Sequence, residues 1–273
     1  MRVRACPDPS RKGIRITVNN PPQGFASSAA ILVITVIFVV WWLTLIVWCS
    51  VRARRRGKLR HAIVVVLLVT LAAAAETPYD ALINWQWFNS REGPVLYTAF
   101  QRGMPLWGAL TYGAWIGTMA VIGLWAKENG WSKRALWKVF AALVVFDFAG
   151  ESLMMHFGVA VYYGHQSPRL LEVPVVWPFV FTGSFLLIGM VFHHLIPKLS
   201  GARSVAVIPM GIGVVFAAGC FLGWPSMVAL GMNLASPWTD VMAAITVATV
   251  LYWFGVVANT PSAAPARPVP DSE

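Results

Sequence analysis

Four carboxylic acids lie within or at the ends of apolar stretches of the sequence, and they are the residues best suited to chemistry. They form two pairs, Glu76 with Asp80 and Asp147 with Glu151, and the four-residue spacing places each pair on one face of a helix. Like charges at this spacing repel and an apolar interior disfavours charge, so we expect at least one acid of each pair to hold its proton. A protonated acid beside an ionised one is the usual arrangement for general acid and general base catalysis.

The composition indicates a membrane protein. The chain has 273 residues, of which 58% are hydrophobic and only 12% charged, whereas soluble domains carry roughly 25% charged residues. The net charge of +10 comes largely from arginines between apolar stretches, where they mark cytoplasmic loops and contact anionic lipid headgroups. We therefore expect a lipid bilayer as partner and no nucleic acid. The three cysteines show no CxxC spacing and predict neither a disulfide framework nor a zinc site.

Seven apolar stretches predict an all-α fold, a polytopic bundle of about seven transmembrane helices. Each stretch is close to the ~20 residues that a helix needs to cross the hydrocarbon core. They cover residues 29–50, 61–83, 106–126, 136–157, 174–196, 205–224 and 239–258. We divide the chain into a disordered basic tail (1–28), a transmembrane domain (29–258) and a disordered C-terminal tail (259–273).

The loops between these stretches predict the orientation in the cell membrane. Lys and Arg residues concentrate in the first, third and fifth loops, and the first holds the run Arg54 to Arg56. Because cytoplasmic loops are the ones enriched in Lys and Arg, this pattern places the N-terminus outside and the C-terminus in the cytoplasm. The basic segment before residue 29 argues for the opposite orientation.

The two acid pairs are predicted to meet. Glu76 lies about 22 Å along its span, and Asp147 and Glu151 lie about 16 and 22 Å along a span that runs in the same direction. The four acids are therefore expected to form one site in the half of the membrane away from the arginines, with Asp80 near its mouth. Ionisable groups at such depth are costly and commonly functional. In the alternative interpretation, the acids satisfy arginines or the backbone groups freed by Pro78.

Polar and aromatic residues near the acids are the candidates for substrate binding. They are Asn84, Trp85, Trp87, Arg102, Trp107, Tyr162, Tyr163, Gln166 and Trp177. The amides and hydroxyls offer hydrogen bonds, and the aromatic faces are suited to stabilising a cation. Two alternatives stay open, because Trp is also common at membrane surfaces and Arg102 would equally suit a lipid headgroup.

Four motifs together resemble the AveC-like spirocyclase family of actinobacterial membrane proteins. They are Glu-x-Pro-x-Asp from Glu76, Arg-Gly-Met-Pro-Leu-Trp from Arg102, Asp-x-x-x-Glu from Asp147 and Tyr-Tyr-Gly-x-Gln from Tyr162. The resemblance covers roughly residues 61–215. It implies a polyketide-tailoring enzyme that closes a hydrophobic dihydroxy-ketone into a spiroketal without a redox cofactor or a metal.

In such a reaction we expect Glu76 and Asp147 to be the acid/base pair, with Asp80, Glu151 and Tyr163 positioning the hydroxyl groups of the substrate. Two other functions stay open. One is a membrane terpene cyclase, in which an acid protonates an epoxide or olefin. The other is a non-enzymatic proton-coupled carrier or ligand sensor, because acids within a membrane are equally typical of proton relays.

Overall fold

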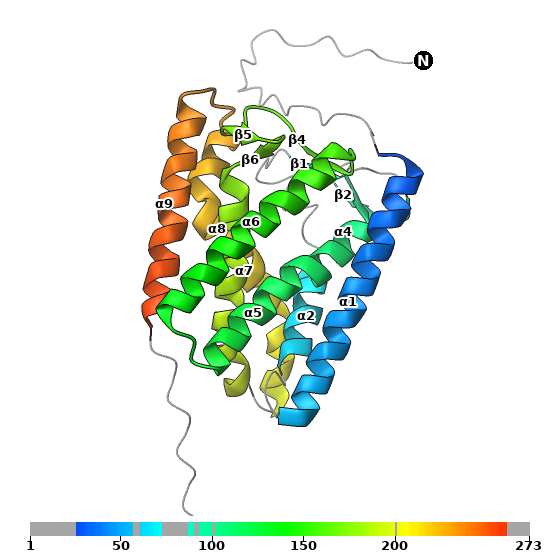
Figure 1. The fold of residues 1–273 in the computed structure, drawn as a ribbon, viewed down its shortest axis with the longest axis vertical. Helices are drawn as coiled ribbons and strands as arrows, with labels where there is room; N and C mark the ends of the chain where they lie inside the picture. Colours follow the sequence, from blue (N-terminus) through cyan, green and yellow to red (C-terminus); the bar gives the residue numbers. More distant parts are fainter. Residues whose placement is uncertain are drawn as a thin grey trace, which may run out of the picture.

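The computed structural model describes residues 26–56, 61–72, 87–89, 93–99, 102–199 and 201–260. Elements carry the labels of Figure 1. The helices are α1 (Ser28–Arg56), α2 (Ala62–Ala72), α4 (Leu106–Thr111), α5 (Gly117–Glu128), α6 (Lys133–His156), α7 (Val176–Leu195), α8 (Val207–Gly231) and α9 (Trp238–Asn259). A π-helical turn, η2 (Tyr112–Ile116), joins α4 to α5, so the described ranges contain seven separate helices.

The predicted all-α membrane fold is confirmed. Six helices in the described part of the chain are long and apolar enough to cross a membrane, and the protein is a multi-pass membrane protein. The helix α2 has 11 residues, which is about 16 Å or half of the hydrocarbon core. The rest of the second predicted span, residues 73–83, lies outside the described residues, as do nearly all residues of the two predicted tails.

Local sequence fixes both ends of α6, the helix that carries the second acid pair. At its start, the Ser132 side chain accepts a hydrogen bond from the backbone N–H of Ala135 at 3.3 Å, which caps the helix. At its end, Gly158 adopts a positive φ of 66°. The N–H of Val159 then reaches back to the carbonyl of Met154 at 2.9 Å, as in a Schellman motif. These two signals set how far the acids lie from the end of the helix.

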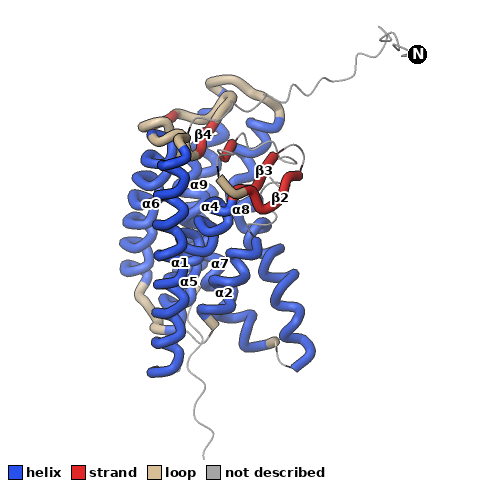
Figure 2. Tube along the Cα trace, turned by 90° about the vertical axis from the view of Figure 1, so that its right-hand side faces the viewer, coloured by secondary structure: helices blue, strands red, loops and turns tan. Residues whose placement is uncertain are grey.

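Three short antiparallel strand pairs gather at one end of the bundle, which we call the hairpin end (Figures 1 and 2). They are β1 (Trp87–Asn89) with β4 (Ala160–Tyr162), β2 (Val95–Ala99) with β3 (Arg102–Pro105), and β5 (Arg169–Leu170) with β6 (Val173–Pro174). They were not predicted from the sequence, because segments of two to five residues are too short to show a strand pattern. The β1–β4 pair ties the segment after α6 to the segment after the second predicted span.

Close backbone contact between α5 and α7 forms the centre of the bundle. A Cβ added at Gly123 would overlap the carbonyl group of Leu186, and one added at Gly189 would overlap the carbonyl oxygen of Ala120. Small residues at such positions let membrane helices approach closely, which is how they gain packing energy in lipid. The two glycines therefore hold the helices around which the others pack.

Substitution of Gly189 tests this contact. We expect Gly189→Ala to lower the free energy of unfolding by about 1–3 kcal/mol, since the new methyl group has no room. The matched control is Gly213→Ala on α8, where nothing lies within 4 Å of the added Cβ. Thermal unfolding in detergent or nanodiscs measures both. Equal midpoints for the two variants would show that α5 and α7 are not in close contact.

Candidate acid/base site

Asp147 and Glu151 are both buried in the bundle, with 3% and 4% of their surfaces exposed. Their four-residue spacing on α6 places both side chains on its inward face. At 1.5 Å per residue they lie about 14 and 8 Å before the end of α6. Helix α6 ends at the hairpin end, whereas α1 ends with its arginines at the opposite end of the bundle (Figure 1).

Each carboxyl group is held through one oxygen by an uncharged aromatic donor. The Trp115 indole Nε1–H donates to Asp147 Oδ1 at 2.7 Å, and the Tyr162 hydroxyl donates to Glu151 Oε1 at 3.1 Å. Within the described residues, Asp147 Oδ2 and Glu151 Oε2 have no hydrogen-bond partner, and neither acid pairs with a cation. One oxygen of each acid is thus held by a donor, while the other is buried without a partner among the described residues.

The indole of Trp115 is fixed in place by close packing. Its six-membered ring lies where a Cβ would stand at Gly150, so the glycine between the two acids is what lets α6 come this near. The ring also packs against Phe146 and Trp41, with centroid distances of 5.0 and 5.8 Å. Trp115 lies in the π-helical turn η2, a local irregularity that is frequent at functional sites.

Tyr162 is supported by a second row of aromatic and polar groups. Its ring stacks on Trp177 of α7, with centroids 6.4 Å apart and planes at 5°. The Trp177 Nε1–H in turn donates to Gln166 Oε1 at 3.0 Å. A continuous series of contacts therefore runs from Glu151 through β4 and α7 to the loop that follows β4.

The environment of Tyr162 keeps it a hydrogen-bond donor. Burial is the largest cause that raises the pKa of Tyr162 well above its ordinary value, and the carboxylates of Glu151 and Asp147 raise it further. Its phenol group accordingly stays protonated at neutral pH and donates to Glu151.

Several residues predicted from the sequence are brought together here, namely Asp147, Glu151, Tyr162, Gln166 and Trp177. Tyr163 follows Tyr162 in the chain and is buried. Its backbone carbonyl accepts a hydrogen bond from Gln166 Nε2 at 3.3 Å, so it supports the loop.

Trp107 lies in the same hydrophobic cluster as Tyr162 and Trp177, with 2% of its surface exposed. Its indole Nε1 is buried and has no partner among the described residues. The ring is therefore part of the apolar wall at the hairpin end.

The other predicted site residues are not placed. Glu76, Asp80, Asn84 and Trp85 lie outside the described residues, so the meeting of the two acid pairs stays a prediction. Trp87 opens β1 and Arg102 opens β3, and only the backbones of these two residues are described.

Trp115 was not among the site residues predicted from the sequence. One signal was present, because a glycine at position 150, between the two acids, permits close approach by a bulky group. This signal does not name the partner of Asp147, because Trp115 is 32 residues away in the chain. That pairing depends on how α5, η2 and α6 pack.

A metal site does not emerge from the described ranges, where no group of three or more His, Cys, Asp or Glu side chains is close enough to hold an ion. No protein-family model, curated protein or solved structure matches this chain. The likeness to AveC-like spirocyclases therefore depends on the sequence motifs alone.

Replacement of Trp115 tests the anchoring of Asp147. We expect Trp115→Phe to lower the free energy of unfolding by about 1–3 kcal/mol, because Asp147 Oδ1 becomes a buried acceptor without a donor. In a background with Asp147→Leu, which has no acceptor, the same substitution should cost clearly less. Thermal unfolding of the four proteins gives this difference.

The matched control is Trp48→Phe. Trp48 packs edge to face on Trp125 and is 37% exposed, so its replacement should change stability by less than about 0.5 kcal/mol. If Trp115→Phe costs the same in both backgrounds, the indole stabilises by packing alone and does not anchor Asp147.

Proposed function

We propose that this protein is a membrane-embedded enzyme that uses Asp147 and Glu151 as a cofactor-independent acid/base pair to close a ring in a hydrophobic substrate. The observation that carries the proposal is the geometry of the pair. Two buried carboxyl groups lie one helical turn apart, each with one oxygen held by a neutral donor and one oxygen without a partner in the described part.

Neither acid pairs with a cation among the described residues, and this supports a role for the two acids in proton transfer. Two unpaired negative charges in a low-dielectric interior are costly, so we propose that one of the two acids is protonated and the other ionised. One acid is then able to donate a proton and the other to accept one, which is what general acid/base catalysis requires. The anchored oxygens fix both groups in place, so little reorganisation is needed during reaction.

The reaction we favour is spiroketal formation, as the motif resemblance implies. One hydroxyl group of a dihydroxy-ketone adds to the carbonyl carbon and gives a hemiketal. Protonation of the hemiketal hydroxyl releases one water and leaves an oxocarbenium ion, which the second hydroxyl captures with loss of a proton. The acid protonates the leaving oxygen and the base takes the proton from the attacking one, so the pair ends with the one proton it began with.

Aromatic rings beside the acids suit the cationic intermediate. Trp115 contacts Asp147 directly, and Trp177 stacks on the tyrosine that holds Glu151. The faces of such rings attract cations. Glu76, predicted at the same depth on the second span, is proposed as a third acid of the site.

The same features suit a terpene cyclase, in which an acid protonates an epoxide or olefin and aromatic rings shelter a carbocation. The same residues would serve either reaction, and only the substrate differs. Conversion of an epoxy-isoprenoid in place of a dihydroxy-ketone would favour this second candidate.

Turnover by the purified protein tests the proposal. Protein in nanodiscs should convert a hydrophobic dihydroxy-ketone to a spiroketal with no added cofactor, as followed by mass spectrometry and chiral chromatography. Asp147→Asn and Glu151→Gln should each lower the rate by about 100- to 10,000-fold, the usual contribution of a general acid or base. Glu76→Gln should do the same if the second span completes the site.

The matched control is Asp240→Asn. Asp240 lies in the first turn of α9 and accepts a hydrogen bond from Ser236 at 2.7 Å, away from the pair, so its replacement should leave the rate unchanged. Folding of each variant is checked by its thermal midpoint. If Asp147→Asn and Glu151→Gln both fold and turn over normally, the acid/base role is refuted. Uptake into proteoliposomes that depends on a pH gradient, without conversion, would show a carrier.

A further inference from the structure

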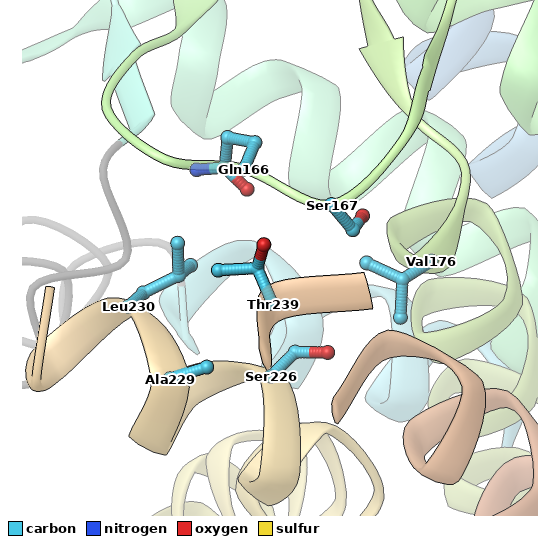
Figure 3. Close-up of a pocket in the computed structure, with 7 residues that line it drawn as sticks. All are labelled: Gln166, Ser167, Val176, Ser226, Ala229, Leu230 and Thr239. Carbon is cyan, nitrogen blue, oxygen red and sulfur yellow. The ribbon is translucent and has the colours of Figure 1, made fainter. Parts of the chain in front are cut away.

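A small cavity that several hydroxyl groups line lies at the hairpin end, between the loop after β4 and the helices α8 and α9 (Figure 3). Its walls are Gln166, Ser167, Val176, Ser226, Ala229, Leu230 and Thr239. It leaves about 10 Å³ for the centre of a water-sized sphere, which is close to the space that one water molecule requires. The cavity is too small for an organic substrate.

One wall of the cavity carries an unsatisfied hydroxyl group. Ser167 is 94% buried, since 6% of its surface is exposed, and its Oγ has no hydrogen-bond partner within the part of the chain that the structure describes. A buried hydroxyl without a partner costs about 1–3 kcal/mol. A ligand that accepts its proton would remove this cost.

A second wall carries the Ser226 hydroxyl, whose oxygen can accept a hydrogen bond, as the hydrogen bonds around Thr246 of α9 show. Pro225 lies inside α8, and beyond it the backbone N–H of Ser226 donates across to Thr246 Oγ1 at 3.0 Å. The Thr246 hydroxyl donates its only proton to the carbonyl oxygen of Met242 at 2.8 Å. In the 2.8 Å contact between the two hydroxyls, Ser226 must therefore be the donor, and its Oγ keeps lone pairs for a further bond.

We infer that this cavity binds one water molecule, held by the hydroxyl groups of Ser167, Ser226 and Thr239. The water accepts the proton of Ser167 and donates one to Ser226. Its third bond goes to Thr239, whose hydroxyl oxygen points toward the loop that carries Gln166 and Ser167 (Figure 3). Three hydrogen bonds are typical of a buried water. A cation fits less well, because none of the described lining residues is a carboxylate that would compensate its charge.

The position of this water gives it a structural role next to the acid pair. It joins the loop after β4 to α8 and to the start of α9, which lie about 60 and 70 residues further along the chain. The same loop carries Gln166, which accepts the hydrogen bond from Trp177, and Trp177 stacks on Tyr162. The water therefore helps fix the aromatic row that holds Glu151, whatever reaction the acids perform.

A structure at a resolution that shows ordered solvent tests the inference. We expect one solvent peak within hydrogen-bond distance of Ser167, Ser226 and Thr239 in the unmodified protein, and the same peak in protein prepared with choline in place of Na⁺ and K⁺. No peak, or a peak that disappears without Na⁺ and K⁺, would overturn the assignment to water.

Two variants extend the test. Ser167→Ala and the near-isosteric Thr239→Val each remove one partner, so we expect loss of the peak and a lower thermal midpoint in either variant that folds. The control is Ser50→Ala on α1, whose hydroxyl donates to the carbonyl of Ile46 at 2.7 Å within its own helix. A peak that persists at full height in Ser167→Ala and Thr239→Val would show that these hydroxyls do not hold the water.

Discussion

The constraint on which the site depends is the cost of burying two carboxyl groups inside a membrane protein. The described residues supply no cation for them, although ion pairing is a common solution for charges in this setting. Each acid is held by a neutral donor instead, an indole N–H for Asp147 and a phenol for Glu151. Because no cation among the described residues holds either acid in its ionised form, the pair can gain or lose a proton, and its net charge changes accordingly.

The surrounding bundle is shaped so that those two donors reach α6 from different directions. The π-helical turn brings Trp115 toward α6, and Gly150 removes the side chain that would have blocked the indole. The tyrosine comes from a strand that begins just after the Schellman motif at the end of α6. The π-helical turn and Gly150 therefore make the hydrogen bond to Asp147 possible, and the turn after α6 makes the one to Glu151 possible.

The sequence was enough to predict the parts of the structure that depend on long or regular patterns. Apolar stretches of about 20 residues predict membrane helices, and the spacing of Asp147 and Glu151 predicts that they share a face. The strand pairs were missed because two to five residues carry too little pattern. The partner of Asp147 was missed because Trp115 is brought near only by helix packing, and an aromatic residue in an apolar span looks like any other core residue.

The two anchors also differ in how firmly they are tied to the bundle. Trp115 belongs to a transmembrane helix and is enclosed by rings from α1 and α6, so it cannot leave Asp147 unless the bundle loosens. Tyr162 belongs to a three-residue strand whose neighbour β1 comes from another part of the chain. Movement of that strand alone would break the hydrogen bond between Tyr162 and Glu151 and leave every membrane helix intact. The hydrogen bonds that hold the two acids can therefore break independently of each other.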